Sequence, residues 1–257
     1  IAKGIWYGVF HSISAFCNAG FDLMGIRQQY SSLTSFVGDP FVNFAIMALI
    51  VIGGIGFMTW DDIKTNGLKW KRYRMQSKVI LTTTALLILI PAAYFFFFEF
   101  SDAPLNERIW SSFFQSVTPR TAGFNTVDLT TISETGCMIM IALMLIGGSP
   151  GSTAGGMKTT TFAVMLSNAV SVFRRREHTH FFGRRISSDT LRNAATIFTM
   201  YVTLCLVGGC AISYMENLPL VTCLYETASA VGTVGLTLGI TPELGLPSQY
   251  ILIFLMY

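Results

Sequence analysis

Five apolar stretches, separated by polar or glycine-containing segments, organise this chain. They cover residues 40–58, 79–98, 136–173 and 194–215, and a fifth begins at about residue 250 and is only started before the sequence ends. A helix needs roughly 20 apolar residues to cross the hydrocarbon core of a bilayer. The third stretch contains glycines and a proline that cannot continue a regular helix, so it predicts a broken span. The pattern therefore predicts an all-α membrane protein.

Three short segments between these stretches are similar to one another. Each is an amphipathic stretch followed by small residues around one glycine, and the glycines are 103 and 112 residues apart. The three motifs are Asn18-Ala19-Gly20, Thr121-Ala122-Gly123 and Thr233-Val234-Gly235. In the second copy, residues 107–117 are expected to form a half-helix that ends at Thr118, because the residue before a proline disfavours helix. An internal repeat of this period predicts repeated helix–pore loop–helix units.

The motifs have the chemistry of an ion-selectivity filter. Backbone carbonyl groups of a TVGYG segment replace the hydration shell of potassium in potassium channels, and Thr233-Val234-Gly235 matches the first half of that signature. We therefore predict that the nine motif residues bind K⁺ through backbone carbonyls, with K⁺ or Na⁺ as the transported or activating ion and no covalent cofactor. No copy has a second glycine two positions further on. A shorter filter with weaker selectivity is expected.

Composition and charge predict the setting and the orientation. Of 257 residues, 52% are hydrophobic and 12% charged, with a mean hydropathy of +0.55, which indicates a membrane protein. Segments 61–78 and 174–192 hold 12 of the 17 basic residues, so both are predicted to be cytoplasmic. The motifs then lie towards the outer side with 10 of the 14 acidic residues. These acids either concentrate cations in a vestibule or only solubilise the outer loops.

A glycine-rich segment, residues 147–158, interrupts the third apolar stretch. It is expected to form an intramembrane gating loop below the filter, built from Gly147, Gly148, Ser149, Pro150, Gly151, Ser152, Thr153, Ala154, Gly155, Gly156 and Lys158. A phosphate-binding P-loop is rejected, because Met157 separates the second glycine from the lysine and the preceding segment is a membrane span. Lys158 is either a functional group near the membrane interior or a side chain that reaches the cytoplasmic interface.

Other polar residues predict less. The five cysteines have no CxxC spacing; four are expected to pack in apolar helices as small apolar residues, and Cys17 borders the first motif. His178 and His180 are interpreted as part of a solvated basic loop rather than a metal site. Arg120 is expected to pair with Glu107 or Asp128 behind the pore rather than to place a positive charge in it.

Two other classes of function were weighed against a pore. An intramembrane protease using Ser149 or Ser152 would need a base, and no histidine lies in any predicted span, so no enzyme is predicted. A cation carrier with inverted repeats and broken helices fits the glycine-rich break. It does not fit the three motifs, which all lie on one side of the predicted membrane.

The three motifs and the glycine-rich break together resemble the potassium-uptake family of TrkH and KtrB proteins, most closely its KtrB members. The resemblance covers the whole chain. It implies repeats arranged pseudo-fourfold around a central ion pore, with the first repeat and most of the last helix outside this sequence. The implied units are the second repeat (1–60), a cytoplasmic loop (61–78), the third repeat with its broken inner helix (79–173), a second cytoplasmic loop (174–192) and the fourth repeat (193–257).

The resemblance also implies a function and partners. It implies potassium uptake across a bacterial plasma membrane, through a homodimer with one pore per subunit. The expected regulator is a cytosolic ring of RCK-type, KtrA-like nucleotide-binding subunits, docked on the basic segments. Anionic lipid headgroups are the other partner expected there, and no nucleic acid is expected.

Overall fold

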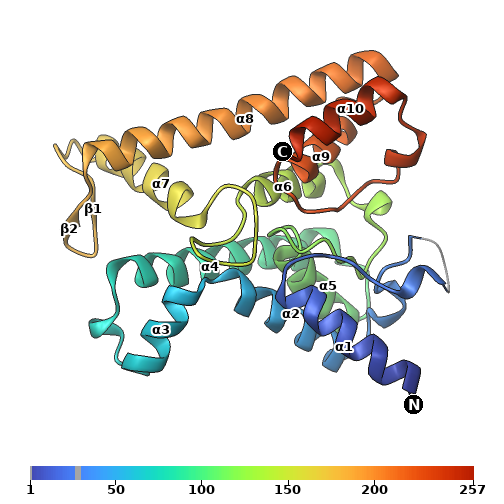
Figure 1. Ribbon diagram of the computed structural model, residues 1–257, viewed down its shortest axis with the longest axis horizontal. Coiled ribbons are helices and arrows are strands. Elements are labelled where there is room, and N and C mark those ends of the chain that lie inside the picture. The colour runs from blue at the N-terminus through green and yellow to red at the C-terminus, as the bar shows by residue number, and fades with distance from the viewer. Residues whose placement is uncertain (1, 27–29) are drawn as a thin grey trace.

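The computed structural model describes residues 2–26 and 30–257, and almost every regular element in them is a helix (Figure 1). The α-helices are α1 (Ala2–Phe16), α2 (Pro40–Gly54), α3 (Phe57–Asn66), α4 (Met75–Tyr94), α5 (Leu105–Val117), α6 (Glu134–Leu145), α7 (Thr159–Phe173), α8 (Ser188–Glu216), α9 (Leu220–Val231) and α10 (Leu246–Leu255). Shorter helical turns are η1 (Met24–Ile26), η2 (Thr34–Phe36), η3 (Trp70–Arg72), the π-helical η4 (Phe95–Glu99), η5 (Leu129–Thr131) and η6 (Thr241–Glu243). Strands β1 (His180–Phe181) and β2 (Arg184–Arg185) form an antiparallel hairpin. The prediction of an all-α fold is confirmed.

Two helices in the described residues are long and apolar enough to cross a membrane. They are α4 with its continuation η4, 25 residues, and α8, 29 residues. The third predicted span is broken as expected, into α6 and α7. The first predicted span, residues 40–58, is wrong at its end, because α2 stops at Gly54 and the chain turns by 98° into α3. Gly56, with φ of +86°, makes this turn, and the polar residues that follow occupy α3.

The three half-helices that precede the motifs are α1, α5 and α9. Helix α1 packs on α2, α5 packs on α4, and α9 packs between α6 and α8 (Figure 1). The half-helix predicted at residues 107–117 is observed as α5. Each half-helix ends inside the molecule, and the chain leaves it as irregular backbone. Such backbone is tolerated at membrane depth only where protein buries it or where it lines a water-filled path.

Two apolar clusters hold the return segments. One, around Phe95, Met140 and Tyr225, joins η4, α6 and α9 and includes Leu236, the residue after Gly235. The other, around Ile50 and Phe114, joins α2 and α5 and includes Phe124, the residue after Gly123. Phe124 and Leu236 are almost fully buried, whereas Phe21, the equivalent residue of the first motif, is 70% exposed. The second and third motifs are therefore anchored in the core, and the first lies at its edge.

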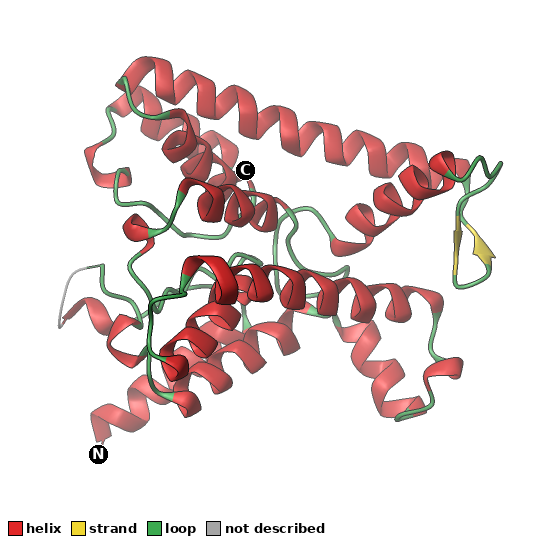
Figure 2. Cartoon of the chain, turned by 180° about the vertical axis from the view of Figure 1, so that it is seen from behind, coloured by secondary structure: helices red, strands yellow, loops and turns green. Residues whose placement is uncertain are grey.

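The two basic segments lie at the same end of the molecule. The β1–β2 hairpin and the α3–η3 region are both at the left of Figure 1 and at the right of Figure 2, which views the chain from behind. Their common position agrees with one cytoplasmic face. The predicted loop at 61–78 is partly helical, because α3 extends to Asn66 and α4 begins at Met75.

Candidate functional site: three return segments above a glycine-rich loop

The three motifs share one unusual backbone conformation. The first and third residues of each have positive φ: 50° and 72° at Asn18 and Gly20, 60° and 79° at Thr121 and Gly123, and 53° and 88° at Thr233 and Gly235. The middle residues do not. Side chains resist positive φ, and the resistance is strongest for β-branched residues such as threonine. The same costly conformation at three equivalent positions indicates a constrained site.

The motifs lie next to one another in sequence order. A Cβ added to Gly20 would be 2.5 Å from the carbonyl oxygen of Ala122, and one added to Gly123 would be 2.3 Å from the carbonyl oxygen of Val234. Around Gly235, by contrast, the structure places nothing within 4 Å of an added Cβ. The first motif therefore abuts the second, the second abuts the third, and the third faces open space.

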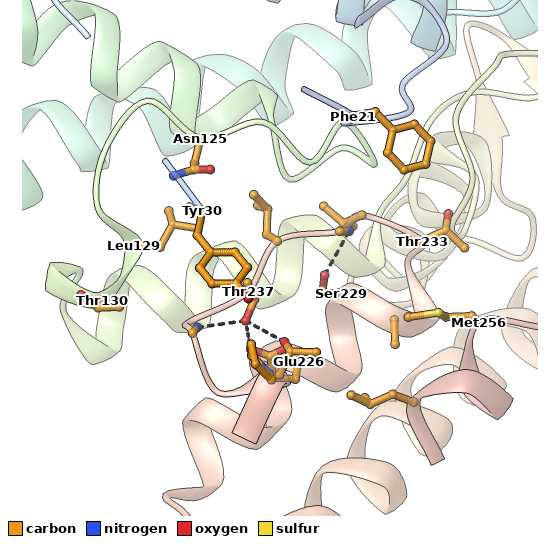
Figure 3. A pocket seen from close by; sticks show the side chains of 18 of the residues that line it. Phe21, Tyr30, Asn125, Leu129, Thr130, Glu226, Ser229, Thr233, Thr237 and Met256 are labelled. Carbon is orange, nitrogen blue, oxygen red and sulfur yellow. Dashed lines mark hydrogen bonds between the residues drawn. The ribbon is translucent and has the colours of Figure 1, made fainter. Parts of the chain in front are cut away.

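That open space is a cavity of about 810 Å³ (Figure 3). Ala19 and Phe21 line it from the first motif, and Thr233, Val234 and Gly235 line it from the third. The cavity therefore occupies the gap between the third and first motifs. The three segments and this gap together surround one region.

The glycine-rich loop, residues 147–158, touches the first residue of every motif. The hydroxyl of Thr153 is 2.9 Å from the side-chain oxygen of Asn18. The backbone N–H of Gly155 donates to the hydroxyl of Thr121 at 3.2 Å. A Cβ on Gly155 would be 2.0 Å from the hydroxyl oxygen of Thr233, so the loop backbone lies directly against the third motif. The structure thus brings together the two predicted groups of site residues.

The end of α2 holds the loop from its other side. The N–H of Ser149 donates to the carbonyl of Gly54 at 2.9 Å, and that of Thr153 donates to the carbonyl of Gly53 at 3.2 Å. A Cβ on Gly53 would be 1.9 Å from the carbonyl oxygen of Phe16, so only glycine fits there. Neither glycine is predicted from the sequence to contact the loop. The available signal was the run Gly53-Gly54-Ile55-Gly56 inside an apolar stretch.

Further bonds close the loop on itself. The N–H of Gly147 donates to the carbonyl of Met157 at 2.8 Å, which brings the two ends of the loop together. The ammonium of Lys158 donates to the carbonyl of Ala154 at 2.8 Å and is half-buried. Lys158 also stands immediately before α7. Its side chain folds back onto the loop.

Arg120 does not make the predicted ion pair. Its side chain is buried, 4% exposed, and its Nη2 donates to the hydroxyl of Thr84 at 3.3 Å. Within residues 2–26 and 30–257, no carboxylate lies within 4 Å of it. The physical reason is the length of α5: at 1.5 Å per residue Glu107 lies roughly 15 Å along this half-helix from its last residue, Val117, and Arg120 follows beyond that end. Asp128 caps η5 instead, accepting from Thr130.

The remaining side chains for which the sequence gives a prediction are the cysteines and two histidines. The five cysteines are free thiols. The rings of His178 and His180 are 6.5 Å apart. No group of three or more histidine, cysteine or acidic side chains suited to a metal ion occurs in the part of the chain that the structure describes.

The fold and site define a helical membrane protein in which three return segments lie against one glycine-rich loop. Residues 2–257 match the family described as TrkH, cation transport protein, and the chain belongs to this family. It is 39% identical to the potassium/sodium uptake protein NtpJ of Enterococcus hirae and 37% identical to the Ktr system potassium uptake protein B of Bacillus subtilis. Both alignments cover all of this chain, and 57% and 58% of those proteins, so the chain spans little more than half their length.

A solved structure supports the fold. The potassium transporter TrkH of Vibrio parahaemolyticus superposes with a TM-score of 0.76 at 19% identity, over 96% of this chain and 54% of that one. The family resemblance and the helical membrane fold predicted from the sequence are therefore confirmed. The family is one of cation transport proteins and not of enzymes, as predicted.

Proposed function

We propose that the protein carrying this chain takes up potassium across the bacterial plasma membrane through a filter lined by the backbone of the three motifs. The observation that carries the proposal is the close approach of two motif glycines to the middle carbonyl of the next motif, Gly20 to Ala122 and Gly123 to Val234. Backbone oxygens crowded around one axis, with no side chain between them, can replace the hydration shell of a monovalent cation. The names of the relatives, potassium or potassium/sodium uptake proteins, support the choice of ion.

A fourth segment would complete the filter. Three segments leave one side of the site open, and the cavity of about 810 Å³ lies there, beside Gly235. This supports the pseudo-fourfold arrangement and the division into units 1–60, 79–173 and 193–257, with the remaining repeat contributed by residues outside this sequence. The relatives are long enough to hold it.

The loop at residues 147–158 is the proposed gate. It lies against the first residue of all three motifs, where an ion leaving the filter towards the basic face would pass. Hydrogen bonds join it to the end of α2 and to the first and second motifs. A loop held in this way can move between arrangements, and a cytosolic partner that binds one arrangement better would bias the equilibrium.

The expected partner is a nucleotide-binding RCK-type ring acting on a homodimer. Helix α7 runs from the gate to the basic segment 174–192 and is 15 residues long, roughly 22 Å at 1.5 Å per residue. A partner bound at Arg174–Arg176 would therefore act on one end of a rigid element whose other end is the loop.

An alternating-access carrier remains the rival mechanism. The intramembrane loop suits it, since a carrier also needs a barrier on one side of the ion site. The contacts among the three motifs favour a pore, because they form a continuous backbone lining rather than a site between two inverted halves. Ion flux after removal of the loop separates the two: a pore becomes leaky, whereas a carrier loses transport.

The test of the function is potassium uptake by the complete protein in cells that lack their own potassium transport. Wild type should restore uptake, and Gly123→Ser should reduce discrimination of potassium against sodium, since its Cβ would meet the carbonyl of Val234 at 2.3 Å. Gly4→Ser is the matched control, because nothing lies within 4 Å of a Cβ there. Absence of uptake by wild type, or equal selectivity of wild type and Gly123→Ser, would contradict the proposal.

A further inference from the structure

Two of the half-helices carry a polar side chain that binds the return segment beyond the motif. In the first copy, Nε2 of His11 accepts from the N–H of Leu23 at 3.3 Å. In the third copy, Oε1 of Glu226 accepts from the N–H of Leu238 at 3.0 Å. Both acceptors precede their motif glycine by nine residues, and both donors follow it by three. Two different side chains therefore make the same bond at the same position of the repeat.

The carboxylate of Glu226 is fully engaged with the third return segment. Besides Leu238, Oε1 accepts from the hydroxyl of Thr237 at 2.6 Å, and Oε2 accepts from the hydroxyl of Thr241 at 2.7 Å (Figure 3). The residue is 4% exposed, and no basic side chain lies within 4 Å of it among the residues the structure describes. A buried carboxylate without a cation persists only where such bonds replace its hydration. The bonds tie residues 237–241 to α9.

His11 makes the corresponding link in the first copy and extends it to the second. Its Nδ1 is 2.6 Å from the carbonyl of Tyr7, so Nδ1 carries the proton and Nε2 is free to accept from Leu23. The ring is 5% exposed and its centroid is 6.4 Å from that of Phe124, which follows Gly123. His11 therefore connects the first return segment to the anchor of the second motif.

In the second copy the return segment is held by other contacts. Its equivalent half-helix residue is Phe114, which has no acceptor, and the equivalent of Leu23 is Thr126. The second return segment is held instead by the first unit: the N–H of Leu33 donates to the carbonyl of Asn125 at 2.9 Å, and the N–H of Asn125 donates to the hydroxyl of Ser32 at 3.3 Å. All three return segments are thus fixed just past their glycines.

We propose that His11 and Glu226 are positioning residues for ion selectivity, which fix the outer ends of the first and third return segments. The inference rests on the proposed filter. The carbonyls of a motif can face one axis only if the chain is held at both ends, and the loop contacts described above hold only the first residues. Loss of either side-chain acceptor should lower discrimination of potassium against sodium about tenfold, as expected for losing one or more buried bonds to a side chain of this kind.

The experiment uses the complete protein in proteoliposomes and measures potassium uptake in competition with sodium. Glu226→Leu should lose about tenfold in selectivity. Glu226→Gln should stay within about twofold of wild type, because its amide oxygen still accepts from Leu238 and the hydroxyl of Thr241 can turn to accept. Glu243→Leu, which removes an exposed acid from neighbouring η6, is the matched control and should leave selectivity unchanged.

Two further sets of variants distinguish a positioning role of these side chains from an effect of their charge and from misfolding of the variant protein. His11→Leu should lower selectivity, and His11→Gln should largely preserve it. Thr237→Val and Glu226→Leu together should cost less selectivity than the sum of the two single changes, since they share the bond between these side chains, although the Thr237 hydroxyl also contacts the Thr241 hydroxyl and accepts from the N–H of Gly239. If a leucine variant fails to reach the membrane, the Glu226→Gln protein still decides: a loss of about tenfold in Glu226→Gln relative to wild type would show that charge matters, and would overturn the proposal.

Uptake by the wild-type protein distinguishes a failure of the proposed filter from a failure of the positioning role. Wild-type uptake of potassium with unchanged selectivity in Glu226→Leu and His11→Leu would overturn only the positioning role. Absence of wild-type uptake of any monovalent cation would overturn the filter and the positioning role together.

Discussion

The hydroxyl of Thr153 offers the sharpest test of the proposed gate. It lies 2.9 Å from both the side-chain oxygen of Asn18 and the carbonyl of Phe16, and no other side chain joins the loop to the first motif in the described residues. Thr153→Val removes this hydroxyl while keeping the shape of the side chain. The loop's remaining contacts, through the backbone of Ser149 and Gly155, stay in place.

The size of the effect follows from what is left behind. Removing a hydrogen-bond donor costs about 0.5–1.5 kcal/mol net, and about 1–3 kcal/mol where a buried acceptor loses its partner. Asn18 is 8% exposed, and Thr153 is the donor that its side-chain oxygen has in the structure, so the larger range applies. A loss of about 1–3 kcal/mol from the closed arrangement would raise the ratio of open to closed loops roughly 5- to 150-fold.

The assay is potassium or rubidium flux into proteoliposomes holding the complete protein without any cytosolic partner. Flux through Thr153→Val should exceed wild type at least fivefold and should depend less on the partner when it is added. Thr153→Ser keeps the hydroxyl and should behave as wild type. Thr161→Val is the second control, since its hydroxyl makes no bond within residues 2–26 and 30–257. Equal or lower flux in Thr153→Val, with normal membrane levels, would refute the gating role of this contact.

Three further predictions test the surroundings of the gate. Deletion of residues 149–155 should raise flux and remove its regulation, whereas a merely structural loop would give less protein or less flux. Gly53→Ala should lower the free energy of unfolding by about 1–3 kcal/mol or more, because its Cβ would be 1.9 Å from the carbonyl of Phe16. Gly54→Ala, whose Cβ has its nearest neighbour at 3.8 Å, is the control and should not lower it. Similar melting temperatures for the two variants would contradict this prediction. Charge reversal at Arg174–Arg176 should weaken partner-dependent activation and leave selectivity unchanged, and intact activation would place the coupling elsewhere.

The sequence was most informative where the backbone itself is constrained. The motif glycines and the glycine-rich break could be predicted, because only glycine tolerates the positive φ seen at Gly123 or the close approach of Gly155 to Thr233. Such positions require glycine, and the glycines are visible in the sequence. The half-helix of the second copy could be placed for the same reason, since a proline ends it.

Contacts between distant segments could not be predicted in this way. The turn of 98° after Gly54 depends on how the loop packs against the end of α2, and hydropathy alone continued the span to residue 58. The error at Arg120 had a different origin. The predicted pair with Glu107 or Asp128 is wrong because the rise of 1.5 Å per residue along α5 separates Glu107 from the turn that holds Arg120, and Asp128 caps η5. Helix geometry applied to the sequence would have excluded the pair with Glu107.

The three copies of the repeat show why the motif glycines can be recognised from residue type, whereas the side chains that bind the return segments cannot. A return segment whose φ lies between 72° and 88° favours glycine, and Gly20, Gly123 and Gly235 occupy this same position. The acceptor for an N–H two or three residues past the glycine can be an imidazole, a carboxylate or the hydroxyl of a neighbouring segment, and this chain uses all three. His11 and Glu226 share no side-chain chemistry except the ability to accept a hydrogen bond. Their equivalence therefore appears only when the copies are aligned on the glycines and the bonds are compared, which requires the structure.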